Sequence, residues 1–134
     1  MQKDFDTASD NQPSHPSIGL DLDGCCDEHN PFFKTLSGSW PGKVYVISYR
    51  SDRAKAIADL ARLQIRYDEL ILVNSFGAKA EVLAAEGITI FFDDQPEMLK
   101  NVSPERTVML VRNEGNFDFD DRRWILSNET GKLI

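Results

Sequence analysis

"IGLDLDGCCDE", residues 18–28, is the stretch that decides how this chain folds. An apolar run ends in Asp21 and Asp23, which are separated by one residue, and a glycine follows directly. Residues i and i+2 of an extended chain point the same way, so the two carboxylates can face one space while Leu22 turns into the core. Either these aspartates are ordinary solvated loop charges, or a cation binds between them.

Length and composition limit the classes of protein that the chain can belong to. A chain of 134 residues suits one domain, which we place at residues 18–134. Residues 1–17 are polar and lack apolar periodicity, so we predict a flexible tail. That tail resembles neither a secretory signal nor a transit peptide, and no segment is long enough to cross a bilayer, so we expect a soluble, cytoplasmic protein without a membrane partner.

The net charge of -7 disfavours a protein that binds the phosphate backbone of nucleic acids, because such proteins usually carry a basic surface. The same argument does not apply to a nucleic acid end held at a single site.

Five apolar runs rich in β-branched and aliphatic residues predict strands. They are Ser17 to Asp21, Lys43 to Ser48, Glu69 to Val73, Ile88 to Phe92 and Thr107 to Val111. Each run is almost continuously apolar, which is typical of strands buried on both faces of a parallel sheet.

Helical patterns separate these runs. The first has Asn30 as its cap, Pro31 as its first helical residue and Gly38 as its stop. The others cover Ser51 to Ile65 with Ser51 as the cap, Ala78 to Glu86 before Gly87, and a short segment from Pro96. We expect the packed residues to be Phe32, Phe33 and Leu36 in the first helix and Ala54, Ile57, Ala58, Ala61 and Ile65 in the second. The alternation predicts an α/β fold, a three-layer sandwich with a parallel, doubly wound sheet of about five strands.

Polar side chains follow the ends of three predicted strands. They are Asp21 and Asp23, Ser48, and Asp93 and Asp94, and Lys79 opens the helix that leads to the last pair. In doubly wound sheets, ligands bind outside the carboxyl ends of the strands. Oxygen ligands without histidine or thiol suit Mg²⁺, while an ammonium and a hydroxyl can bind a phosphoryl group. The set therefore predicts phosphoryl transfer.

These motifs, in this order, resemble the haloacid dehalogenase-like (HAD) superfamily. They read "GLDLDG", "VYVIS", "AKAEV" and "IFFDD", they span Gly19 to Asp94, and the strand ending at Val111 also fits. The resemblance implies a Rossmann-like sheet in which strands four, one and two lie side by side. It also implies a Mg²⁺-dependent phosphatase.

The resemblance further implies a role for each residue. Asp21 would be the nucleophile that forms an aspartyl-phosphate, and Asp23 would protonate the leaving oxygen and later activate water. Ser48 and Lys79 would stabilise the transferred phosphoryl group and the nucleophile. An acid at the position of Asp23 favours phosphate-ester hydrolysis, because the dehalogenase and phosphonatase branches lack it.

The implied Mg²⁺ ligands are the carboxylate of Asp21, the backbone carbonyl of Asp23 and the carboxylate of Asp93, with Asp94 acting through water. Arg50 and Arg112 follow the second and fifth strands. Each arginine is either a surface charge or a bidentate contact to the substrate anion.

The connections between motifs are too short for the cap domain that many HAD enzymes carry, so we expect a capless enzyme. An open site suits a bulky phosphorylated substrate, such as a phosphoprotein or a nucleic acid end, or a wall supplied by a neighbouring subunit; we expect a homo-oligomer. Two alternatives remain: a phosphate and Mg²⁺ binding module with little turnover, acting in regulation or assembly, and a phosphotransferase. In the segment after Val111, "RRWILS" is either an extra edge strand or an arm.

Overall fold

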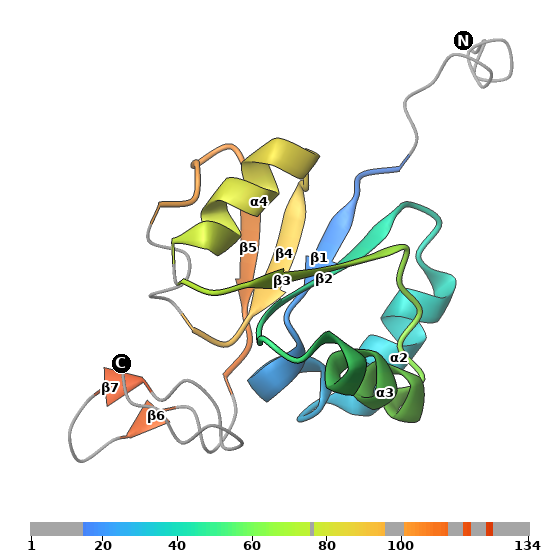
Figure 1. The fold of residues 1–134 in the computed structure, drawn as a ribbon. Coiled ribbons are helices and arrows are strands. Elements are labelled where there is room, and N and C mark those ends of the chain that lie inside the picture. The colour runs from blue at the N-terminus through green and yellow to red at the C-terminus, as the bar shows by residue number, and fades with distance from the viewer. Residues whose placement is uncertain (1–14, 76, 96–100, 113–116, 119–122, 125–134) are drawn as a thin grey trace, which may run out of the picture.

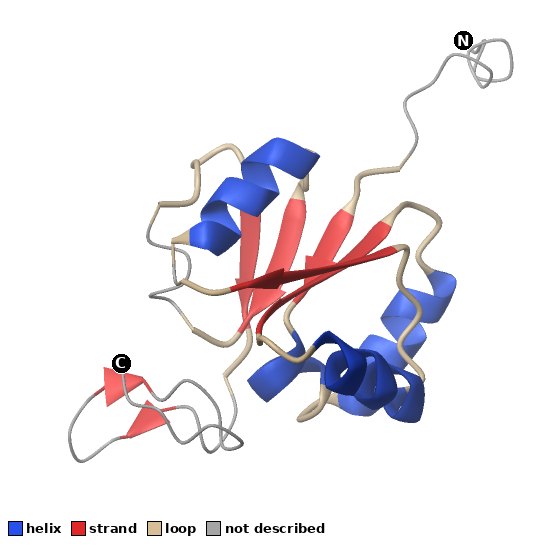
Figure 2. Cartoon of the chain, in the orientation of Figure 1, coloured by secondary structure: helices blue, strands red, loops and turns tan. Residues whose placement is uncertain are grey.

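The computed structural model describes residues 15–75, 77–95, 101–112, 117–118 and 123–124. Its central sheet contains β1 (Ile18–Leu20), β2 (Val44–Tyr49), β3 (Glu69–Val73), β4 (Ile90–Asp93) and β5 (Thr107–Leu110). These five strands are all parallel and lie in the order β3-β2-β1-β4-β5 (Figure 1). Helices cover both faces of the sheet (Figure 2), which confirms the predicted three-layer α/β sandwich.

The pairing of β1 with both neighbours brings three strand ends to one edge of the sheet. Leu20 pairs with Val46 of β2 on one side and with Phe92 of β4 on the other. The strand β4 begins at Ile90 rather than at Ile88, because the Ile88 N–H donates to the Leu83 carbonyl of the preceding helix at 3.0 Å. Ile88 therefore packs in the core while its backbone completes the helix end.

The helices divide the core into two halves. Figure 1 places α2 (Asn30–Ser39) and α3 (Arg53–Leu63) on one face of the sheet and α4 (Ala78–Glu86) on the other. Val44 and Val46 of β2 pack in the cluster that includes α2 and α3, whereas Tyr45 and Ile47 pack in the cluster that includes α4. Burial on both faces is why the strands read as continuous apolar runs.

The predicted packed face of α3 is wrong. The helix buries Ala56, Leu60 and Leu63, whereas Ile57 is 43% exposed. The other alanines of the predicted stripe, Ala54, Ala58 and Ala61, are also exposed. Both sets repeat at helical spacing, so periodicity alone cannot choose between them in a helix with apolar residues on two sides. Ile65 is buried as predicted, but it lies beyond the helix end.

Small differences also occur at the helix starts. Asp52 rather than Ser51 caps α3, because its carboxylate accepts the Lys55 N–H at 3.0 Å. In α2, Asn30 lies within the helix and its side-chain amide donates to the Leu63 carbonyl at 2.8 Å, which ties α2 to the end of α3.

The packed face predicted for α2 is partly correct. Phe33 is buried and Leu36 packs against the core, but Phe32 is 56% exposed. As predicted, α4 ends before Gly87, whose φ of 66° is the left-handed conformation that glycine adopts readily.

The remaining strands form a separate pair. Phe117–Asp118 (β6) and Arg123–Trp124 (β7) are antiparallel to each other, so the described part of "RRWILS" does not extend the main sheet. The helix predicted from Pro96 and residues 1–14 of the predicted tail lie outside the described residues. Among the described helices, none combines the length and the apolar character that a membrane span requires.

The observed packing of α3 predicts different effects for two apolar truncations on that helix. Leu60→Ala should lower the free energy of unfolding by about 3 kcal/mol, because Leu60 is fully buried. Ile57→Ala should cost less than about 1 kcal/mol, because the side chain is 43% exposed. Urea denaturation of both variants measures the difference, and a larger loss for Ile57→Ala would show that this packing is wrong.

Candidate active site

The sheet brings the predicted motif residues to the shared edge of β1, β2 and β4. Asp21 follows β1, and its N–H donates to the Phe92 carbonyl of β4 at 2.9 Å. Ser48 lies near the end of β2, and Asp93 is the last residue of β4. Because β1 lies between the other two strands, all three positions are neighbours.

Three buried carboxylates form a compact acidic cluster. Asp21, Asp93 and Asp94 each offer a carboxylate oxygen, and these oxygens lie within 4.8 Å of one another. Asp21 is 4% exposed, and the other two are fully buried. Three carboxylates this close repel one another strongly when ionised, so the cluster needs a cation or protons.

Lys79 supplies one positive charge inside the cluster. It lies in the first turn of α4, it is 1% exposed, and its Nζ donates to Asp21 Oδ1 at 2.8 Å and to Asp93 Oδ2 at 2.7 Å. Burial favours the neutral lysine, but the adjacent Asp21 and Asp93 carboxylates outweigh it and raise the pKa of Lys79 above its ordinary value. One ammonium group is therefore hydrogen-bonded to two carboxylates.

Lys79 donates to two of the three carboxylates, and its single charge cannot offset three negative charges, so the acids hold protons. Burial, reinforced by the Asp93 carboxylate, raises the pKa of Asp21 to about 7, although Lys79 acts in the opposite direction. Burial and the charges of Asp21 and Asp93 raise the pKa of Asp94 to about 10. A divalent cation would replace these protons and permit all three carboxylates to ionise.

These pKa values predict that the metal-free protein loses stability as the pH rises. The folded state keeps protons that the unfolded chain has already released above the ordinary pKa of 3.8. The resulting stabilisation is complete below pH 3.8. It decreases as the pH rises to about 7 for Asp21 and to about 10 for Asp94. Each group changes the free energy of unfolding by at most about 1.4 kcal/mol per pH unit.

Urea denaturation in EDTA at a series of pH values measures this slope. Asp94→Asn should flatten it, because the amide carries no titrating proton, whereas Glu81→Gln on the exposed surface of α4 should not. An equal slope in Asp94→Asn and the native chain would contradict the assignment.

Gln95 orders the acidic cluster, a role that the sequence motifs did not predict. Its N–H donates to Asp93 Oδ1 at 3.0 Å, and its Nε2 lies 3.4 Å from Asp94 Oδ2. The first contact is the turn that an aspartate forms with the backbone two residues later, so Asp93 itself was the signal that could have located Gln95.

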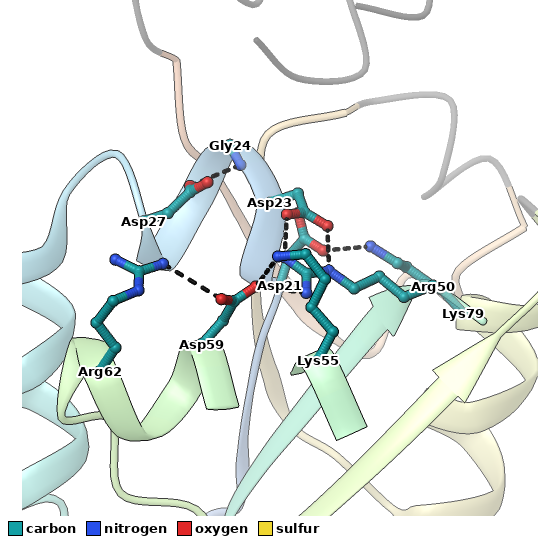
Figure 3. A network of polar contacts seen from close by, with 9 residues as sticks. All are labelled: Asp21, Asp23, Gly24, Asp27, Arg50, Lys55, Asp59, Arg62 and Lys79. Carbon is teal, nitrogen blue, oxygen red and sulfur yellow. Dashed lines mark hydrogen bonds and ion pairs between the residues drawn. The ribbon is translucent and has the colours of Figure 1, made fainter. Parts of the chain in front are cut away.

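Gly24 explains why glycine follows the two aspartates. It lies in the tight turn η2 (Leu22–Cys26) with a φ of 80°, and a Cβ at this position would collide with the Asp94 carboxylate. Its N–H donates to Asp27 Oδ1 at 2.8 Å (Figure 3). The first and fourth motifs are therefore in direct contact through a residue without a side chain.

Asp23 is not part of the acidic cluster and contacts a different partner. Its two carboxylate oxygens accept from Arg50 Nη2 at 2.7 Å and from Arg50 Nε at 2.9 Å (Figure 3). Arg50 Nη1 in turn donates to Asp59 Oδ2 of α3 at 2.7 Å. The hydrogen bond to Asp23 is the main reason that the pKa of Arg50 lies above its ordinary value. Asp59 was not predicted, since nothing in its helical context marks it.

Ser48 is fully buried, and within the described part of the chain its Oγ has no hydrogen-bond partner. Buried hydroxyl groups are nearly always paired, so this one is a candidate contact for a ligand. Arg112 lies beyond the end of β5 and is exposed, and its contact to a substrate remains a prediction.

No family model, curated protein or solved structure matches the chain. The resemblance to the HAD superfamily therefore stays a prediction that rests on the four motifs. The chemistry of the site is inferred from the geometry of its residues.

Proposed function

We propose that the protein is a Mg²⁺-dependent phosphomonoesterase of the HAD type, acting through an aspartyl-phosphate. The observation that carries the proposal is the buried Lys79, which is hydrogen-bonded to both Asp21 and Asp93 while Asp94 lies within reach of both. Burying three carboxylates costs stability, so a role in binding and catalysis explains their presence better than a role in folding does.

The donor set fits Mg²⁺. Asp21, Asp93 and Asp94 offer only hard oxygen ligands, which Mg²⁺ prefers over nitrogen and sulfur. Asp21, Asp93 and the backbone carbonyl of Asp23 would hold the ion, with Asp94 acting through water. When bound, Mg²⁺ would offset the negative charges of the carboxylates and of the phosphate oxygens.

The protein residues would divide the reaction between them. A carboxylate oxygen of Asp21 attacks phosphorus, the bond from phosphorus to the leaving oxygen breaks, and Asp23 donates the proton that the leaving oxygen takes. Asp23 then removes a proton from water, which attacks phosphorus and releases inorganic phosphate and free Asp21. Lys79 orients Asp21, and Ser48 Oγ donates to an oxygen of the phosphoryl group.

The second candidate is a phosphate and Mg²⁺ binding module with little turnover. The observation that favours it is that the acidic cluster of Asp21, Asp93 and Asp94 does not include the Asp23 carboxylate, so an ion could bind there without an acid to donate a proton. The module and the enzyme share their ligands and differ in whether Asp23 can act.

The surroundings of the site favour a bulky phosphorylated substrate. Only residues 74–77 separate β3 from α4, which leaves little chain at this point to cover the site. A homo-oligomer in which a second subunit supplies a wall is part of the proposal. Light scattering coupled to size-exclusion chromatography determines the number of subunits.

Phosphate release from a panel of aryl, nucleotide, sugar and peptide phosphates tests the function. We expect release with Mg²⁺ that stops in EDTA and returns when Mg²⁺ is restored. A folded sample that binds Mg²⁺ by calorimetry but releases phosphate from no member of the panel would favour the binding module. A folded sample that binds no Mg²⁺ would contradict both candidates.

A further inference from the structure

A chain of ion pairs connects three elements beside the acidic cluster. Asp23 belongs to η2, Arg50 follows β2, and Asp59 lies in α3. The Arg50 guanidinium donates Nε and Nη2 to Asp23 and Nη1 to Asp59, at distances of 2.7 to 2.9 Å. Figure 3 shows this chain next to Asp21 and Lys79.

The chain is more enclosed than ordinary surface ion pairs. The side chain of Arg50 is 17% exposed, and those of Asp23 and Asp59 are each 13% exposed. By contrast, Lys55 and Arg62 also contact Asp59, but their side chains are 65% and 66% exposed. Water screens such exposed pairs and leaves them with little energy, so Arg50 is the partner that holds Asp59.

The charges around Arg50 argue against a direct role in binding the substrate anion. Its single positive charge is shared between the Asp23 and Asp59 carboxylates. Three of its N–H groups already donate to these two carboxylates, which leaves fewer donors for a bidentate contact to a phosphate group. The planar guanidinium is instead well suited to fixing the direction of one carboxylate.

We propose that Arg50 and Asp59 are positioning residues, which together fix the Asp23 carboxyl group toward the leaving oxygen of the substrate. The inference rests on the proposed phosphatase function. Proton transfer requires the acid to lie within about 3 Å of the oxygen that receives the proton. An aspartate side chain can rotate about its two side-chain bonds. The two parallel hydrogen bonds from Arg50 Nε and Nη2, which form a fork around the carboxylate, prevent that rotation. Asp59 holds the guanidinium from the opposite side.

The leaving group distinguishes positioning of Asp23 from binding of the anion. An alkyl phosphate has a poor leaving group that needs a proton, whereas p-nitrophenolate leaves without one. Arg50→Met and Asp59→Asn should each lower kcat for glycerol phosphate by at least about tenfold. Asp23 also serves the later water step, which both esters share, so the release of p-nitrophenolate is followed in a single turnover. The same variants should change that single-turnover rate by less than about threefold and keep the half-saturating ester concentration within about twofold.

Conservative variants and a matched control complete the experiment. Asp59→Glu keeps the carboxylate and should recover part of the lost kcat, whereas Arg50→Lys should not, because an ammonium cannot form the fork. Lys55→Met removes another partner of Asp59 and should behave as the native chain does. Circular dichroism and calorimetric Mg²⁺ binding check that each variant is folded with an intact acidic cluster.

Each contrary outcome overturns the proposal in a recognisable way. Equal losses for both esters with a raised KM would mean that Arg50 binds the substrate anion. Unchanged kinetics in Asp59→Asn and Arg50→Met would mean that the chain of ion pairs has no part in the reaction. A native chain that releases no phosphate would remove the proposed function, and this inference with it.

Discussion

Replacing Asp21 by Asn should lower Mg²⁺-dependent phosphate release by on the order of a thousandfold or more. The amide has nearly the shape of the carboxylate but lacks the charge and the nucleophilic oxygen that would form the aspartyl-phosphate. Stability should not fall in parallel, because the substitution removes one of three crowded carboxylates. Initial rates of phosphate release and urea denaturation of the same samples measure the two effects.

Glu81→Gln serves as the matched control, since it removes one carboxylate from an exposed position of α4. It should leave the rate of phosphate release unchanged. If Asp21→Asn retained more than about a tenth of the native rate, Asp21 would not be the nucleophile. If it lost both activity and folding, the carboxylate would be a structural group.

Replacing Lys79 by Met should lower the free energy of unfolding by about 3–5 kcal/mol in EDTA at neutral pH. The substitution leaves Asp21 and Asp93 buried without their shared ammonium. Adding Mg²⁺ should recover part of the loss by offsetting the same charges. Urea denaturation with and without Mg²⁺ measures both changes.

Lys55→Met is the control for this substitution, because its side chain is 65% exposed and it should change stability by less than about 0.5 kcal/mol. The double variant Lys79→Met with Asp93→Asn should be more stable than Lys79→Met alone. The second substitution removes the Asp93 carboxylate, which the first leaves buried without its ammonium partner. Equal stability of the two lysine variants would contradict the buried position of Lys79.

The sheet, and the strand ends at which the candidate site residues lie, could be predicted because they depend on local patterns. Apolar runs that end in polar residues identify both the strands and their carboxyl ends, and in parallel sheets those ends share one edge. Asp21, Ser48 and Asp93 therefore came together as the motif order indicated. The position of Lys79 near the same strand ends could also be predicted, because this residue lies at the start of the helix that leads into β4.

The partners of individual side chains could not be predicted in the same way. Asp23 lies in the first motif, yet its carboxylate turns to Arg50, and Arg50 reaches Asp59 on another element. Such choices depend on distances between elements that the sequence does not encode locally. The prediction for the packed face of α3 was wrong for a related reason. Ile57 and Leu60 are both apolar, and which of them is buried depends on how the helix packs against the sheet.

The double contact of Lys79 also has a consequence for the order in which the protein folds. Its bond to Asp21 joins residues 58 positions apart in the chain, and its bond to Asp93 requires β4 to be docked as well. Contacts between distant segments form late, because the intervening chain must first be ordered. We therefore expect Lys79 to pair with the Asp21 and Asp93 carboxylates in one of the last steps of folding. Mg²⁺ bound at this site should accordingly slow the unfolding reaction and leave the folding rate nearly unchanged.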